Sequence, residues 1–352
     1  MSSKHHFKPC YCKYNLQKTM YKLALLLACI AFTGCSDSQK TKYDSKILCA
    51  DIGATRIKAQ VLHPDMTLSE LQRTNIFHFP SNSWLNERLP LLFSPQENSC
   101  LMQQFRGSYD VISFGITGPV ADEKYYVNSE RKIPRNLKQK CTELAGCPVF
   151  VENDAIVWAR GALVWQNLMS KKVQYPCLAI TLGTGAGIVL LRSPDDMVGI
   201  EIYFLDISFS HLKKVTSGQP DYNELNMPWP HNAIGEAFFV WARNEHPEWD
   251  DARIQLTYNE RIAAFVEDMQ ELLQQQFQIQ LKSVMIGGGN SRYTSSRYLK
   301  SKLSKQIMLL NAQHLAKHKV SSDIIALLGC IHPPEYKKAS LFPSWDDISR
   351  KK

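Results

Sequence analysis

Short apolar runs that lead into a glycine or a carboxylate recur along the chain and predict β-strands. One run covers residues 46–51 and a second covers residues 57–62, so residues 53–56 form a tight turn between two strands. The arrangement returns where apolar residues 177–181 and 188–191 flank a glycine-rich stretch. Two strand–turn–strand units of this kind predict a duplicated α/β domain.

Other segments fill in the predicted fold between and after these units. Further strands are predicted at 110–115, 148–152 and 282–286, and a helix is predicted from 155 to 165. Apolar residues at helical spacing between 262 and 273 predict another helix, and a last one is predicted to begin near residue 323. The length of 352 residues exceeds the ~250 residues that one core usually supports. Two lobes around a central cleft are therefore expected.

The two predicted turns carry residues suited to binding phosphate. Glycine lets backbone N–H groups approach phosphate oxygens, because no Cβ stands in the way. The first turn holds Gly53, Ala54 and Thr55, and the second holds Gly183, Thr184 and Gly185. An ordinary hairpin explains either turn alone, whereas both together favour a nucleotide site.

Two carboxylates stand at predicted strand ends. Asp51 precedes the first turn and could hold Mg²⁺, directly or through water, because this cation takes oxygen ligands. Asp154 follows Asn153 after another strand and could accept a proton as a general base. The ordinary structural roles are a turn residue for Asp51 and the N-cap of the next helix for Asp154, and capping is compatible with catalysis.

The order of the motifs resembles the ROK (repressor, open reading frame, kinase) family and bacterial glucokinases. Asp51–Lys58 (DIGATRIK) resembles the family's first phosphate motif. The other similar segments, in chain order, are Gly115–Val120 (sugar-side loop), Pro134–Leu137, Glu152–Ala155 (catalytic motif), Leu182–Gly187 (second phosphate motif) and Ile286–Gly289 (adenosine loop). The resemblance covers about residues 46–332 and implies an α/β fold with two actin-like (ribonuclease H-like) lobes.

The resemblance also implies roles for individual residues. ATP and Mg²⁺ would be the cofactors, with Asp51 as the metal ligand and Asp154 as the base. The implied ATP-binding residues are Asp51, Gly53, Ala54, Thr55, Gly183, Thr184, Gly185, Gly287, Gly288 and Gly289. The implied sugar-binding residues are Gly118, Pro119, Asn153, Asp154, Glu201 and Glu236.

The sugar side departs from the family pattern. The family usually has isoleucine, glycine and histidine after the glutamate that matches Glu201, whereas this chain has Tyr203 and Phe204 after its isoleucine. His211 or His231 could substitute for that histidine only if the fold brings it near. The family's zinc-binding cysteine-rich segment is absent from the sequence. ATP binding is therefore better supported than specificity for glucose.

The N-terminal segment predicts that the chain is directed to a membrane. Lys22 precedes the apolar run 23–32, and small residues then lead to Cys35, as in a bacterial lipoprotein signal in which that cysteine is lipidated. The alternative is an apolar extension on a cytoplasmic enzyme. Much of the net charge of +8 lies on the two tails, and no helix-turn-helix or basic-aromatic surface indicates nucleic-acid binding.

These observations predict a signal segment (1–35), an N-terminal lobe (36–157), a C-terminal lobe (158–335) and a polar tail (336–352). The predicted activity is ATP-dependent phosphorylation of a hexose, with glucose as the first candidate. The alternatives are a kinase for an N-acetylhexosamine and an exported sugar- or nucleotide-binding protein of the same fold without turnover. A transcription factor is disfavoured, because the segment before Lys46 is too short and apolar for a winged helix. The sequence leaves open whether the chain forms a homodimer.

Overall fold

The computed structural model describes residues 45–81, 83–118, 120–121, 124–125, 132–199, 209–216 and 231–331. The contacts between residues divide the chain into two units, Met1–Ser45 and Lys46–Lys352. The second is the compact unit described below. No helix in the described ranges is both long enough and apolar enough to cross a membrane. Several predicted features lie outside them: Cys35, Pro119, Glu201, Tyr203, Phe204, the side chain of His231 and the tail from 336.

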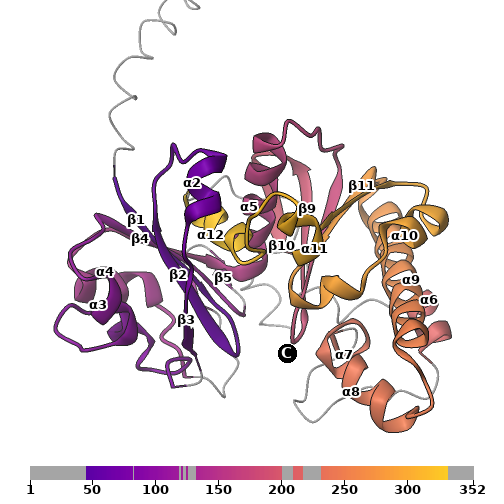
Figure 1. Cartoon of the computed structure of the whole chain (residues 1–352), viewed down its shortest axis with the longest axis horizontal. Coiled ribbons are helices and arrows are strands. Elements are labelled where there is room, and N and C mark those ends of the chain that lie inside the picture. The colour runs from indigo at the N-terminus through magenta and orange to yellow at the C-terminus, as the bar shows by residue number, and fades with distance from the viewer. Residues whose placement is uncertain are drawn as a thin grey trace, which may run out of the picture. The chain divides into compact units, whose positions relative to one another are not determined.

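The first half of the compact unit is built on a five-stranded sheet (Figure 1). Its strands are β1 (Ile47–Ile52), β2 (Arg56–Leu62), β3 (Phe77–Pro80), β4 (Val111–Ile116) and β7 (Val149–Asn153). They lie in the order β3-β2-β1-β4-β7, with β1, β4 and β7 parallel and β2 antiparallel to both of its neighbours. The smaller elements of this half are α2 (Leu68–Arg73), the 3₁₀ helix Leu89–Phe93, α3 (Cys100–Phe105), β5 (Val120–Ala121), β6 (Lys124–Tyr125) and α4 (Leu137–Ala145).

The second half repeats the same topology. Its strands are β8 (Cys177–Leu182), β9 (Ala186–Ser193), β10 (Asp196–Gly199), β11 (Ser283–Gly287) and β12 (Gln306–Leu310). The order β10-β9-β8-β11-β12, with β8, β11 and β12 parallel, matches the first sheet strand for strand. The helices of this half are α6 (Ser210–Val215), α7 (His231–Ile234), α8 (Glu236–Glu245), α9 (Asp251–Phe277), the 3₁₀ helix Gly289–Tyr293, α10 (Ser296–Lys302) and α11 (Ala312–Ala316). The duplicated α/β fold that the sequence predicts is confirmed.

Two helices pack against each other, and one of them contacts both sheets whereas the other contacts the first. Helix α5 (Asp154–Leu168) contacts strands of each half, and α12 (Ile324–Ile331) lies beside it on β1, β2 and β4 (Figure 1). The helices approach so closely that a Cβ on Gly161 would lie 1.7 Å from the Ile325 carbonyl oxygen. A Cβ on Gly329 would lie 1.8 Å from the Val157 oxygen. Glycine at both positions therefore permits this crossing.

One apolar cluster joins the halves through these helices. It includes Cys49 of β1, Trp158 of α5, Ala179 of β8 and Leu328 of α12. The thiols of Cys49 and Cys177 are buried in these strands and form no disulfide. Helix α5 runs through position 157/158, where the sequence analysis places the boundary between the lobes.

Candidate active site

Strand β1 delivers Asp51 to the edge of the first sheet. The β1–β2 hairpin turns there, and the Gly53 N–H donates to the Arg56 oxygen at 3.0 Å. Asp51 is 9% exposed, whereas Thr55 at the tip of the turn is exposed. The strand–turn–strand unit predicted from the sequence is thus formed, and phosphate binding by its turn stays a prediction.

Parallel pairing brings Asp154 to the same edge. Asp51 on β1 pairs with Gly115 on β4, which pairs with Glu152 on β7, and Asp154 follows at the start of α5. A Cβ on Gly115 would lie 3.2 Å from the Asp154 Cα, so the glycine gives this aspartate room. Burial and the negative charge of Asp51 raise the pKa of Asp154 to about 7, against the opposing effect of Lys58.

Asn153, and not Asp154, caps helix α5. The Asn153 Oδ1 accepts from the N–H groups of Ala155 and Ile156 at 3.0 and 3.2 Å. Its Nδ2 donates to the Gly118 oxygen at 2.8 Å, which ties the predicted sugar-side loop to the helix. Asp154 occupies the first position of the helix and is not its N-cap, although its Oδ1 also accepts from the Ala155 N–H at 2.9 Å.

Glycines from two segments meet at the second turn. The Gly183 N–H donates to the Gly185 oxygen at 2.8 Å, and Asn290 Nδ2 donates to the Gly183 oxygen at 2.7 Å. Gly288 has a φ of 86°, and a Cβ there would lie 2.4 Å from the Leu182 oxygen. The predicted second phosphate loop and the predicted adenosine loop, residues 287–289, therefore lie side by side.

Helix α5 connects the second turn and residues 287–289 with the edge of the first sheet where Asp154 lies. A Cβ on Gly287 would lie 2.1 Å from Cζ2 of Trp158, so the indole packs directly on the glycine backbone. Trp158 is one helical turn after Asp154. A single helix thus presents the candidate base at its start and packs on the predicted adenosine loop one turn later.

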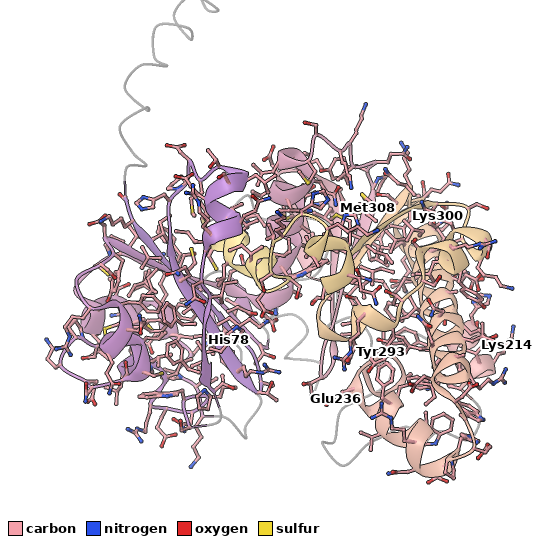
Figure 2. The ribbon with its side chains drawn as sticks, in the orientation of Figure 1. His78, Lys214, Glu236, Tyr293, Lys300 and Met308 are labelled. Atoms are coloured by element: carbon pink, nitrogen blue, oxygen red, sulfur yellow. The ribbon has the colours of Figure 1, made fainter. Side chains whose placement is uncertain are left out.

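Glu236 lies at the second turn. It begins α8, its N–H donates to the Thr184 oxygen at 3.1 Å, and the Thr184 hydroxyl lies 3.4 Å from its Oε2 (Figure 2). The sequence resemblance implies a sugar contact for Glu236. The structure places its exposed carboxylate beside the predicted second phosphate loop, and the sugar contact stays a prediction.

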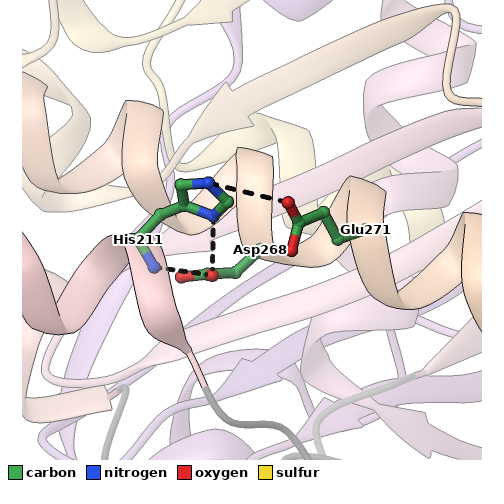
Figure 3. A group of neighbouring side chains, drawn as sticks. All are labelled: His211, Asp268 and Glu271. Atoms are coloured by element: carbon green, nitrogen blue, oxygen red, sulfur yellow. Dashed lines mark hydrogen bonds and ion pairs between the residues drawn. The ribbon is translucent and has the colours of Figure 1, made fainter.

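His211 is engaged between α6 and α9 (Figure 3). Its Nδ1 is 3.0 Å from Asp268 Oδ1, and its Nε2 is 3.6 Å from Glu271 Oε1. Asp268 also accepts the N–H groups of His211 and Leu212, at 2.9 and 2.8 Å, and so anchors the start of α6. Because both ring nitrogens face carboxylates, His211 is not free to replace the missing sugar-side histidine.

The sequence analysis gave no role to three charged or titratable residues beside Asp51. Lys58 Nζ is 2.9 Å from Asp51 Oδ2 and 3.4 Å from Asp323 Oδ1. His78 Nε2 is 3.6 Å from Asp323 Oδ2. The hairpin register alone places Lys58 opposite Asp51, whereas nothing in the local sequence connects Asp323 with them.

Comparisons with known proteins agree with this arrangement. Residues 47–193 match the model of the ROK family, and the search of curated proteins finds no match. A ROK family protein from Streptococcus pneumoniae in complex with sucrose is 15% identical, with a TM-score of 0.51, and the match covers 81% of this chain and 96% of that one. A ROK hexokinase from Thermus thermophilus is 16% identical, with a TM-score of 0.50 and coverage of 81% and 97%.

A ROK family transcriptional regulator has a similar fold too, at 12% identity and a TM-score of 0.50, with coverage of 81% of this chain and 79% of that one. At such identities a structural likeness shows the fold. The predicted resemblance to the ROK family is therefore confirmed, because the family's sequence pattern spans residues 47–193 and the chain has the actin-like fold of ROK proteins.

Proposed function

We propose that the chain is an ATP-dependent kinase that phosphorylates a hydroxyl group of a sugar, with Asp154 as general base. The carboxyl group of Asp154 carries this proposal. It is held at a sheet edge beside Asp51 and the first glycine turn, it does not cap its helix, and its pKa is raised to about 7. A carboxylate with such a pKa accepts a proton at neutral pH better than an ordinary aspartate does.

The reaction follows from that position. An Asp154 oxygen accepts the proton of the sugar hydroxyl while the hydroxyl oxygen bonds to the terminal phosphorus of ATP and the bond to ADP breaks. The N–H groups of Gly53 and Gly183 are bonded within their turns, so the other backbone N–H groups of the two turns would bind phosphate oxygens, and Thr55 and Thr184 offer hydroxyl donors. The loop 287–289 supports the nucleoside. The chain's own residues thus supply orientation and proton transfer.

The residues around Asp51 fit a magnesium ion. Asp51 provides the carboxylate oxygens, the nearby Asp154 carboxyl group is kept for the proton, and Lys58 is the cation within hydrogen-bonding distance of Asp51 among the described residues. Such an oxygen-rich, acidic site suits Mg²⁺, which Asp51 would hold directly or through water. When bound, the ion would neutralise charge on the phosphates.

Glucose is the proposed first acceptor, and an N-acetylhexosamine is the alternative. The ROK family structures of a hexokinase and of a sucrose complex support a sugar site in general. Asn153 and Gly118 would line that site in this chain, because their hydrogen bond joins the sugar-side loop to the start of α5.

The experiment is ADP release measured with the purified protein, ATP and Mg²⁺ against a panel of hexoses and N-acetylhexosamines. We expect release that depends on one class of sugar. Tight sugar or nucleotide binding without ADP release from any member would instead identify a binding protein without turnover.

A further inference from the structure

A row of polar side chains crosses three adjacent strands beside the first turn. Asp51 on β1 pairs with Lys58 on β2, and Lys58 pairs with His78 on β3, so the three side chains share one face of the sheet. Asp323, next to the start of α12, lies over this row and contacts both Lys58 and His78. Figure 2 shows His78 on its strand at this sheet.

Lys58 therefore stands between two carboxylates. Its Nζ is 2.9 Å from Asp51 Oδ2 and 3.4 Å from Asp323 Oδ1. The Lys58 side chain is 28% exposed and the Asp51 side chain 12%, so the lysine is the more accessible side chain of the pair. A lysine has a long stem and three donors, which lets it change partners without moving the backbone.

The Lys58 ammonium and a divalent cation compete for Asp51. Both need its oxygens, and the two cations repel each other at such distances. A metal–nucleotide complex brings phosphate oxygens that can receive the displaced ammonium in a charge-assisted hydrogen bond. Asp323 can retain Lys58 during the exchange, because it belongs to a different element and holds a separate ammonium contact.

We propose that Lys58 is a positioning residue that blocks Asp51 in the empty site and exchanges it for a nucleotide phosphate when the metal–nucleotide complex binds, with Asp323 as its retaining carboxylate. The inference rests on the proposed function, in which Asp51 is the metal ligand. It adds that Lys58 releases Asp51 to the metal when the metal and the nucleotide bind together. The competition thus couples binding of the two cofactors.

The test measures two affinities on each protein. Mn²⁺ alone, followed by electron paramagnetic resonance, reports access to Asp51, and calorimetry with ATP and saturating Mg²⁺ reports nucleotide binding. For Lys58→Met we expect Mn²⁺ affinity to rise about fivefold, because a repelling charge is lost. Nucleotide affinity should fall about tenfold, because a phosphate contact is lost.

Variants of known charge provide the controls. Lys58→Arg keeps the charge and should keep the weak Mn²⁺ binding of the native protein. Asp323→Asn should weaken Mn²⁺ binding, because it removes negative charge and leaves Lys58 to Asp51 alone. Asp65→Asn, at an exposed turn, should change neither affinity. Melting temperatures of all variants identify any loss of folding.

A parallel fall of both affinities in Lys58→Met would show a merely structural role, and unchanged affinities would also overturn the inference. If the native protein binds no nucleotide, the proposed function fails. The Mn²⁺ measurements then still decide whether Lys58 competes for Asp51.

Discussion

The two glycine turns occupy equivalent positions in the two halves and carry different chemistry. The first lies among charged groups, with Asp51 paired to Lys58 and with Asp154 close enough for the charge of Asp51 to raise its pKa. The second is held by neutral hydrogen bonds, from Gly183 to Gly185 and from Asn290 to Gly183. The same strand order thus carries the proposed metal ligand and proton acceptor in one half and a turn held by backbone and amide hydrogen bonds in the other.

This difference separates what the duplicated fold determines for each turn from what the side chains near the turn determine. Identical topology places a turn at the edge of each sheet, and side chains near each turn then decide its task. The exposed Glu236 beside Thr184 is the exception in the second half, because a carboxylate there repels phosphate.

The largest effect should come from acid pH, which lowers activity by protonating Asp154 in the first half of the compact unit. Asp154 accepts a proton only when it is ionised, so kcat/KM should fall about tenfold per pH unit below pH 7. Because Lys58 lowers the pKa of Asp154, Lys58→Met should move this fall to higher pH. Rates normalised to each variant's maximum between pH 5 and 9 provide the measurement. A fall centred near pH 4 would contradict the assignment of the base.

The same carboxyl group should destabilise the folded protein at neutral pH. Its pKa is about 7 when folded and 3.8 when unfolded, so the folded state binds more protons between these values and stability falls as pH rises through that window. Asp154→Asn should raise the free energy of unfolding at pH 8, by at most about 4 kcal/mol. The gain at pH 5 should be less than half as large. Denaturant melts at both values check this, and an equal gain at both would contradict it.

Gly183 tests the cradle of the second half. A Cβ on Gly183 has no atom within 4 Å, so Gly183→Ala should leave the melting temperature unchanged. ATP affinity should fall about tenfold in calorimetry, because the methyl group stands where phosphate approaches the backbone. In the matched variant Gly288→Ala, the positive φ and the Leu182 backbone should lower stability by about 1–3 kcal/mol. Unchanged ATP affinity in Gly183→Ala would remove this turn from the site.

Of these changes, substitution of Glu236 should have the smallest effect, a modest rise in ATP affinity. Glu236→Gln removes a negative charge beside Thr184 and should strengthen ATP binding about two- to fivefold, because the repulsion is partly screened by solvent. Glu245→Gln at the other end of α8 is the control. Weaker sugar binding with unchanged ATP binding would instead support the sugar contact that the resemblance implies for Glu236.

Local patterns were sufficient to predict most of the fold. The strands around both turns and helix α5 lie within one to three residues of their predicted ends, and α12 begins one residue after its predicted start, because glycines and strand-end carboxylates mark several of these ends in the sequence. The capping role offered as the structural alternative for Asp154 belongs to Asn153. Asn153 and Asp154 both cap well, and only the backbone shows which of them precedes the first helical residue.

Contacts between distant segments could not be predicted. Asp323 reaches Lys58 because α12 packs on β1 through the glycine crossing with α5, and no local pattern contains that packing. Glu236 reaches Thr184 from the start of α8, 52 residues along the chain. Burial, which raises the pKa of Asp154, likewise depends on the assembled sheet and helix.

Phosphoryl transfer by Asp154→Asn tests the central claim most directly. ATP labelled in its terminal phosphate is bound to the native protein and to the variant with Mg²⁺, the accepted sugar is added, and label in the sugar is followed through one turnover. The account predicts equal ATP binding and transfer that is slower by about 10²–10⁴ in the variant. A folded Asp154→Asn protein that binds ATP and transfers label at a near-native rate would contradict it.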